Sequence, residues 1–284
     1  MFHQPRTLAH ALQLRAQLGD DVVVVSGCTD IGVAMNHGML RPRAFLDLSR
    51  VDELRKVDHG NGALLLGAGV TFAQLGRMHI RCLREAALSV AGPAIRNMGT
   101  IGGNLVTASP AGDGCVALLA VKADVELTST ARGARWVAVR DFFLDYRKTV
   151  LAADELVTRV RVSQNPLTRW YKIGKRGAVN ISLVCCAVGR NPDGTYGVAF
   201  GCVGPFPLFA PRTEALLNGN ELTGALIAAA ADTAAGEVAP IDDHRGSAAY
   251  RRAMCRTLTR RLLTDIAAGD QQGDADAWRA NRTG

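Results

Sequence analysis

Four consecutive β-branched residues, Val22–Val25, constrain the fold more than any other short stretch of this chain. A short strand that is apolar at every position is typical of a parallel sheet buried on both faces. The strand leads into the predicted loop Ser26-Gly27-Cys28-Thr29-Asp30, and a helix is expected from about Ile31 to His37, with a second strand at Ala44–Leu48. This pattern predicts a βαβ unit whose loop lies at the carboxyl end of its first strand, where such folds bind ligands.

A second glycine-rich segment, residues 91–113, carries the strongest ligand-binding signal. Within it, Gly99-Thr100-Ile101-Gly102-Gly103-Asn104 is expected to form a loop whose backbone N–H groups can approach a ligand closely. Ser109-Pro110 is typical of an N-cap followed by proline at the first helical position, and it predicts a helix over Ser109–Ala123. The unpaired N–H groups of a helix start favour phosphate.

Neither segment matches a common phosphate-binding motif, because Gly-Lys-Ser/Thr and the three spaced glycines of the dinucleotide fingerprint are both absent. One glycine turn after a strand is usually only a turn. Two loops that each open toward a helix can hold the two phosphates of one dinucleotide. Ser109 and Asp113 also have a structural explanation, as a helix cap and a first-turn acid.

The rest of the chain alternates helices and strands, and a polar stretch at 163–166 predicts a domain boundary. Thr71 is expected to cap a helix, and Asn191-Pro192-Asp193-Gly194 predicts a hairpin turn. Further strands are expected at 63–68, 124–128, 136–139, 156–162, 170–173, 182–189 and 196–203, and further helices at 8–18, 81–90, 212–217, 222–238 and 249–267.

The cysteine and histidine patterns argue against a metal site. The chain has seven cysteines and six histidines. No Cys-x-x-Cys pair exists and the number of cysteines is odd, which argues against zinc, an iron–sulfur cluster and a disulfide framework. The histidines show no ligand spacing, so we predict no metal in this chain.

Bulk properties indicate a folded protein that binds neither membranes nor nucleic acid. No apolar run approaches the roughly 20 residues of a membrane helix, and the N-terminus lacks a signal-peptide core, which together predict a cytoplasmic protein. The net charge is +7, but the basic residues are scattered apart from a group on one late helix, and aromatic residues do not interleave with them. A dinucleotide cofactor or an acidic partner subunit explains the charge more simply.

The chain offers no hydrolytic constellation. Ser26 lacks the Gly-x-Ser-x-Gly elbow, and Asp30, Asp47 and Asp113 show no paired-carboxylate spacing. We therefore predict no catalytic side chain and expect a bound cofactor to carry the chemistry.

Three stretches give the chain a recognisable resemblance. Ile95–Asn104, followed by Ala108-Ser109-Pro110 and Asp113, closely resembles the second FAD-binding loop of the molybdenum hydroxylase flavoprotein family, and Ser26–Gly32 is similar to its first. Phe142–Thr149 with Asp154-Glu155-Leu156 resembles a stretch typical of the xanthine dehydrogenases in that family. The resemblance covers about residues 3–267 and includes Tyr171–Arg176, Asn180–Ser182, Phe200-Gly201, Pro205 and Pro211-Arg212.

This resemblance implies an α+β fold. A PCMH-type FAD-binding domain of two subdomains is expected over residues 1–165, with the subdomains at about 1–55 and 56–165. A small C-terminal domain with a three-stranded antiparallel sheet and helices is expected over 166–268, and a flexible polar tail over 269–284.

The resemblance also implies the cofactor-binding residues. Leu156 matches an apolar residue expected against the isoalloxazine ring, and Lys172 matches a basic residue near the flavin; their structural alternatives are ordinary strand core and a solvated surface charge. The other residues expected to bind FAD are Val24, Val25, Ser26, Gly27, Cys28, Thr29, Asp30, Ile31, Thr100, Ile101, Gly102, Gly103, Asn104 and Asp113.

Two positions depart from the family pattern. Cys28 stands where many relatives have glycine or asparagine, and a cysteine there is strained if the backbone requires a positive φ. Val90 stands where animal xanthine dehydrogenases carry an aromatic residue beside the cofactor, so a stacking contact is not expected at this position.

The implied role is that of an oxidoreductase subunit in a hetero-oligomer. A molybdopterin-binding subunit would oxidise the substrate, a [2Fe–2S] subunit would relay the electrons, and FAD on this chain would pass them to NAD⁺. One alternative is the FAD subunit of a related carbon monoxide, aldehyde or N-heterocycle dehydrogenase with a different acceptor. The other is a flavin-free scaffold that keeps the fold, against which the two intact glycine loops argue.

Overall fold

The N-terminal part of the chain is a small parallel sheet. The computed structural model describes residues 1–60, 62–176 and 179–269, so the predicted polar tail lies outside the described residues except for position 269. The sheet has the strand order β1-β3-β2, and all its strands are parallel. Its elements are β1 (Phe2–His3), α1 (Leu8–Leu18), β2 (Val22–Val25), α2 (Ile31–Asn36) and β3 (Ala44–Asp47).

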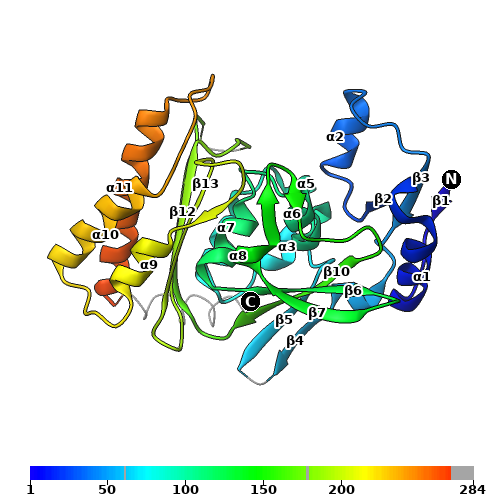
Figure 1. The fold of residues 1–284 in the computed structure, drawn as a ribbon, viewed down its shortest axis with the longest axis horizontal. Coiled ribbons are helices and arrows are strands. Elements are labelled where there is room, and N and C mark those ends of the chain that lie inside the picture. The colour runs from blue at the N-terminus through cyan, green and yellow to red at the C-terminus, as the bar shows by residue number, and fades with distance from the viewer. Residues whose placement is uncertain (61, 177–178, 270–284) are drawn as a thin grey trace.

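An antiparallel five-stranded sheet forms the middle of the molecule, with the order β4-β5-β10-β6-β7 (Figure 1). Side chains alternate along β10, where Val160 and Val162 are buried under helices while Arg159 and Arg161 face solvent. Its elements are β4 (Val57–Gly60), β5 (Ala63–Gly67), α3 (Phe72–Leu75), α4 (Arg81–Ser89), α5 (Pro93–Met98), α6 (Ile101–Thr107), α7 (Asp113–Ala120), β6 (Asp124–Ser129), β7 (Gly133–Ala138), α8 (Val139–Phe142), the hairpin β8 (Phe143–Asp145) and β9 (Lys148–Thr149), and β10 (Leu156–Ser163).

The C-terminal part is an antiparallel sheet that is buried on both faces. Along β12, Val184, Cys186 and Val188 pack in one core with α10 and α11, while Cys185 and Ala187 belong to the core around α7. The sheet therefore forms a wall between its own helices and the middle of the molecule (Figure 1). Its elements are β11 (Leu167–Ile173), β12 (Val184–Arg190), β13 (Tyr196–Gly201), β14 (Leu208–Phe209), α9 (Pro211–Leu217), α10 (Gly224–Gly236) and α11 (Ala248–Ala267).

The α+β class and the βαβ unit are confirmed. Thr71 caps α3 as predicted, because its hydroxyl accepts the N–H of Gln74 and the Gln74 side chain bonds back to the Thr71 backbone. The C-terminal sheet has a fourth, two-residue strand, β14, beyond the three that were expected. Within the described residues, no helix combines the length and apolar character needed to cross a bilayer.

The prediction that a helix begins at Ser109-Pro110 is wrong. The Ser109 hydroxyl accepts the N–H of Ala111 and its carbonyl accepts the N–H of Gly112, which closes a turn rather than a helix start. Gly112 then has a ψ of 85°, which lies outside the helical range, so α7 begins only at Asp113. The predicted loop at Gly99–Asn104 is also largely helical, because α6 begins at Ile101 with Thr100 as its N-cap.

Candidate functional site

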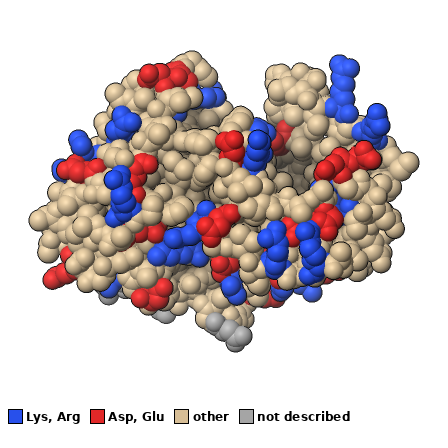
Figure 2. Space-filling view, viewed as in Figure 1, with Lys and Arg blue, Asp and Glu red and all other residues tan. Residues whose placement is uncertain are grey.

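A cavity of about 1270 Å³ lies where the three parts of the molecule meet. It is lined by the β2–α2 loop, the start of α6, the β8–β9 turn and three C-terminal segments around Ser182, Cys202 and Asp243. Figure 2 shows the molecule hollowed along the same edge, between α2 and the loop that precedes α11. Small-molecule pockets commonly measure roughly 300–1,000 Å³, so this cavity has room for a dinucleotide.

The β2–α2 loop offers the cavity a set of unused backbone donors. All residues from Val24 to Ile31 line the cavity. Among the described residues, the backbone N–H groups of Ser26–Asp30 have no protein acceptor. A ligand that supplies several acceptor oxygens, such as a pyrophosphate, would satisfy them.

Gly27 makes this loop geometry possible. A Cβ at position 27 would lie 1.8 Å from the Met98 carbonyl oxygen and 2.4 Å from the Met98 carbonyl carbon. The loop can therefore pack against the end of α5 only if residue 27 has no side chain.

Cys28 has a φ of 58°, so the backbone strain expected at this position is present. The left-handed region costs roughly 1–2 kcal/mol for a residue with a Cβ. We expect Cys28→Gly to raise the free energy of unfolding in urea by about 0.5–1 kcal/mol, because the lost strain exceeds the added freedom of the unfolded chain. Cys28→Ala, which keeps the Cβ but removes the thiol, should give no gain; an equal gain in both variants would assign the effect to the thiol.

At the start of α6 the backbone N–H groups already have protein acceptors, whereas the N–H groups of Gly99–Asn104 were expected to be available to a ligand. The N–H groups of Ile101 and Gly102 donate to the carbonyls of Val70 and Ala68, at 3.0 and 2.9 Å. The N–H of Gly103 donates to the Thr100 hydroxyl at 3.1 Å. A Cβ on Gly102 would lie 2.7 Å from Ala68 Cβ, so this glycine serves the packing of α6 on the end of β5.

The glycine-rich segment at 91–113 contributes several lining residues and one side-chain amide to the cavity. Thr100, Gly102, Gly103 and Asn104 line it, whereas Ile101 is fully buried in the core and does not. The Asn104 side-chain oxygen accepts the N–H of Cys115 at 3.2 Å. Within the described part of the chain the Asn104 amide NH₂ has no protein acceptor, so it remains a donor for a ligand.

Asp113 and Lys172 form a buried ion pair behind the cavity wall and are not among the lining residues of this cavity. Lys172 Nζ lies 2.6 Å from Asp113 Oδ2 and also donates to the Ser89 carbonyl at 3.1 Å. The other Asp113 oxygen accepts the Ser182 hydroxyl at 2.7 Å. The side chains are only 10% and 5% exposed, so Lys172 is not the solvated surface charge that was its structural alternative.

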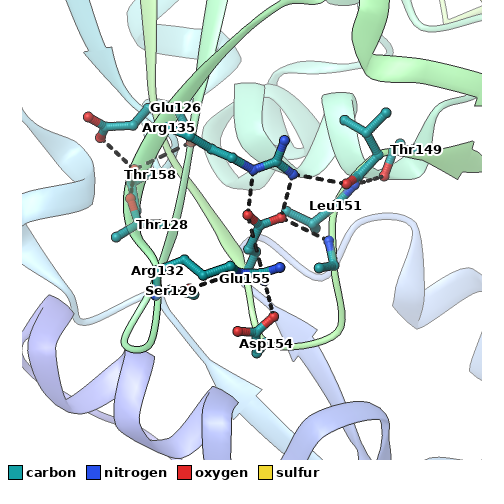
Figure 3. A network of polar contacts seen from close by, with 12 residues as sticks. Glu126, Thr128, Ser129, Arg132, Arg135, Thr149, Leu151, Asp154, Glu155 and Thr158 are labelled. Atoms are coloured by element: carbon teal, nitrogen blue, oxygen red, sulfur yellow. Dashed lines mark hydrogen bonds and ion pairs between the residues drawn. The ribbon is translucent and has the colours of Figure 1, made fainter.

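Leu156 lines the cavity at the start of β10, where the preceding Glu155 is held by a polar network (Figure 3). Glu155 accepts two hydrogen bonds from Arg135, at 2.7 and 2.9 Å, and one from the Ala152 N–H at 2.9 Å. The Arg135 hydrogen bonds lower the pKa of the Glu155 carboxyl against the effect of its burial. Arg132 pairs with Asp154 in the same network.

The β8–β9 turn contacts the β2–α2 loop across the cavity. Arg147 Nη1 lies 3.4 Å from Asp30 Oδ2, and both side chains are about half exposed. Arg147 and the neighbouring Tyr146 line the cavity. The ion pair neutralises Asp30, which would otherwise repel an anionic ligand at this loop.

Asp243 binds several groups on the side of the cavity that the C-terminal part of the chain forms. Its carboxylate accepts the N–H groups of Arg245 and Gly246 and pairs with Arg251 at 2.6 Å. Burial opposes ionisation, but these donors together lower the pKa of Asp243 to about 2.

This depressed pKa predicts an acid-dependent loss of stability. Because the folded pKa lies below the unfolded value of about 3.9, the contribution is complete above about pH 5 and is lost as the pH falls through about 2. We expect the Asp243 interactions to account for roughly 2 kcal/mol of the loss in unfolding free energy between pH 4 and pH 2. Asp243→Asn should flatten that part of the urea-stability profile, and a profile unchanged by the substitution would contradict the assignment.

Apart from Ile101, Asp113 and Lys172, every predicted cofactor-binding residue lines the cavity. The sequence prediction missed the hairpin residues Tyr146 and Arg147 and the C-terminal wall at Ser182, Cys202, Asp243 and Arg251. The sequence did carry a signal for the β8–β9 turn and for Ser182, because both lie in segments that resemble the molybdenum hydroxylase flavoprotein family. In the described residues, no three His, Cys, Asp or Glu side chains come together to hold a metal ion.

Two known families match adjoining parts of the chain. The family described as FAD binding domain in molybdopterin dehydrogenase matches residues 1–164. The family described as CO dehydrogenase flavoprotein C-terminal domain matches residues 169–266.

Individual proteins are similar over almost the whole chain. The nicotinate dehydrogenase FAD-subunit of Eubacterium barkeri is 32% identical over 283 residues, which cover 93% of this chain and 95% of that protein. A putative xanthine dehydrogenase FAD-binding subunit of Escherichia coli (strain K12) is 28% identical, with 94% and 96% covered. A structure of carbon monoxide dehydrogenase from Hydrogenophaga pseudoflava superposes with a TM-score of 0.86 at 30% identity, and 93% of this chain and 95% of that chain are covered.

Proposed function

This chain belongs to the molybdenum hydroxylase family as an FAD-binding subunit, and we propose that it is the electron-exit subunit of a xanthine dehydrogenase-type complex with NAD⁺ as acceptor. The observation that carries the proposal is the β2–α2 loop, which lines a cavity of about 1270 Å³ and whose Ser26–Asp30 N–H groups find no acceptor in the part of the chain that the structure describes. These donors and this volume fit a dinucleotide.

The chain's own residues have defined tasks in this proposal. The Ser26–Asp30 backbone would hold the pyrophosphate, and Arg147 keeps Asp30 neutralised beside it. Leu156 and Val90 would give the cavity apolar contacts for the ring system and exclude water there. Bound FAD would supply the change between single electrons and a hydride. Asp113 and Lys172 do not line the cavity, and their buried ion pair would fix the charge and shape of the residues that do.

The proposal includes partners and a location. The [2Fe–2S] clusters and the molybdopterin would lie in separate subunits of a hetero-oligomer, because this chain has no cysteine pattern for a cluster. All seven cysteines are free, which supports a reducing, cytoplasmic compartment.

NAD⁺ as acceptor is supported by the Phe142–Thr149 stretch and by similarity to a xanthine dehydrogenase FAD-binding subunit. A second candidate substrate class is an N-heterocyclic acid, because a nicotinate dehydrogenase FAD-subunit is 32% identical. That class concerns the partner that oxidises the substrate and leaves the role of this chain unchanged.

The acceptor is tested by adding NADH to the FAD-loaded chain or complex without oxygen. We expect the flavin absorption at about 450 nm to bleach rapidly, because electron transfer with NAD⁺ is reversible. Bleaching by dithionite but not by NADH would contradict NAD⁺ as acceptor and would favour the alternative with another carrier.

A further inference from the structure

Arg251 is a buried cation at the start of α11 with two bonds in different directions. One of its terminal nitrogens donates to the Cys202 carbonyl at 2.8 Å, and the other donates to Asp243 at 2.6 Å. Its side chain is 5% exposed, and Nε has no partner among the described residues. A buried guanidinium is costly unless it is paired and hydrogen-bonded, and Arg251 has a carboxylate and a carbonyl as partners.

The Cys202 backbone that Arg251 holds is strained. Cys202 follows β13 with a φ of 64° and lines the cavity. Its N–H donates to the Pro110 carbonyl at 2.8 Å, and its thiol donates to the Ser182 carbonyl at 3.1 Å. A non-glycine residue keeps such a conformation only where its surroundings fix it, and here bonds fix it from three directions.

Ser182 connects this turn to the buried ion pair. Its hydroxyl donates to Asp113 at 2.7 Å, and Asp113 in turn pairs with Lys172 at 2.6 Å. Asp243, Arg251, Cys202, Ser182 and Asp113 therefore form one polar chain from the last helix to the start of α7. Of these, all but Asp113 line the cavity.

We propose that Arg251 is a positioning residue for the cofactor: its bond to the Cys202 carbonyl fixes the cavity wall at Cys202 and Ser182 and orients the Asp113 carboxylate. The inference rests on the proposed function, since it takes FAD as the ligand of this cavity. Under this proposal α11 influences FAD binding by fixing the cavity lining at Cys202 and Ser182, which the two glycine-containing segments do not do.

The test compares Arg251→Lys with the control Arg252→Lys on the full chain reconstituted with FAD. Arg252 is the exposed neighbour on the same helix. Lysine at 251 keeps a charge near Asp243 but lacks the fork of two terminal nitrogens with which Arg251 bonds Asp243 and the Cys202 carbonyl in different directions. We expect a lower thermal stability, FAD affinity about tenfold weaker and a shifted flavin midpoint potential, because the strained Cys202 turn loses the buried bond from a charged donor that fixes it. The control should change none of the three.

A double-mutant cycle with Ser182→Ala tests whether Arg251 affects FAD binding through Ser182. If Arg251 acts through Ser182, the losses of FAD affinity in Arg251→Lys and Ser182→Ala will be strongly non-additive. Additive losses, or an Arg251→Lys variant within twofold of the unsubstituted FAD affinity and with an unshifted potential, would overturn the inference. If Arg251→Lys does not fold, Ser182→Ala decides, and it must shift the flavin potential. Failure of the unsubstituted chain to bind FAD would instead overturn the proposed function, and this inference with it.

Discussion

Gly27→Ala is expected to weaken FAD binding by about 100-fold, or about 2.7 kcal/mol, since overpacking against rigid backbone costs energy of this order. The added Cβ would lie 1.8 Å from the Met98 carbonyl oxygen, so the loop must move away from α5. That movement displaces the donors of Ser26–Asp30 that would hold the pyrophosphate. The measurement is a fluorescence titration of the apoprotein with FAD.

Gly32→Ala is the matched control for this prediction. Gly32 lies in α2, directly after the same loop, and a Cβ there would meet no described atom within 4 Å beyond its chain neighbours and the backbone of α2. Alanine should be tolerated in the helix and leave FAD affinity unchanged. An unchanged affinity in Gly27→Ala would place the phosphate site elsewhere, and a loss in both variants would mean that the titration reports general loop damage.

Breaking the Lys172–Asp113 pair is expected to have the largest effect on stability. Asp113→Asn should lower the free energy of unfolding by about 3–5 kcal/mol, because it leaves the Lys172 charge buried without its carboxylate. Urea denaturation of the full chain at neutral pH measures this loss. Asp113→Asn combined with Lys172→Met should recover most of it, since no buried charge then remains.

The exposed pair of Arg161 and Asp124 supplies the control. Their side chains are 44% and 32% exposed and lie 2.8 Å apart. Asp124→Asn should change the unfolding free energy by about 0–1 kcal/mol, as for other surface pairs. Equal effects at Asp113 and Asp124 would show that the Lys172–Asp113 pair is not buried as the structure has it.

The sequence could predict features that depend on local patterns. Val22–Val25 form the parallel strand, and Thr71 caps its helix, because strand formation by a β-branched run and helix capping depend on only a few residues. The first loop, Ser26–Asp30, lines the cavity because it follows that strand directly.

Features that depend on distant contacts could not be predicted. Ser109 resembles a helix cap, yet the neighbouring Pro110 carbonyl accepts the N–H of the distant Cys202, and α7 begins only at Asp113. Gly102 resembles a ligand-contacting glycine, yet its main neighbour is Ala68, more than thirty positions away. Arg251 resembles any arginine on a basic helix, and only the fold brings it to Cys202.

We expect this chain to bind FAD in the cavity between its two glycine-containing segments, and the measurement is an absorption spectrum of the purified chain after incubation with FAD and gel filtration. Flavin bands at about 370 and 450 nm should be retained in the unsubstituted protein and lost in Gly27→Ala. A folded, unsubstituted chain that elutes without flavin would contradict it.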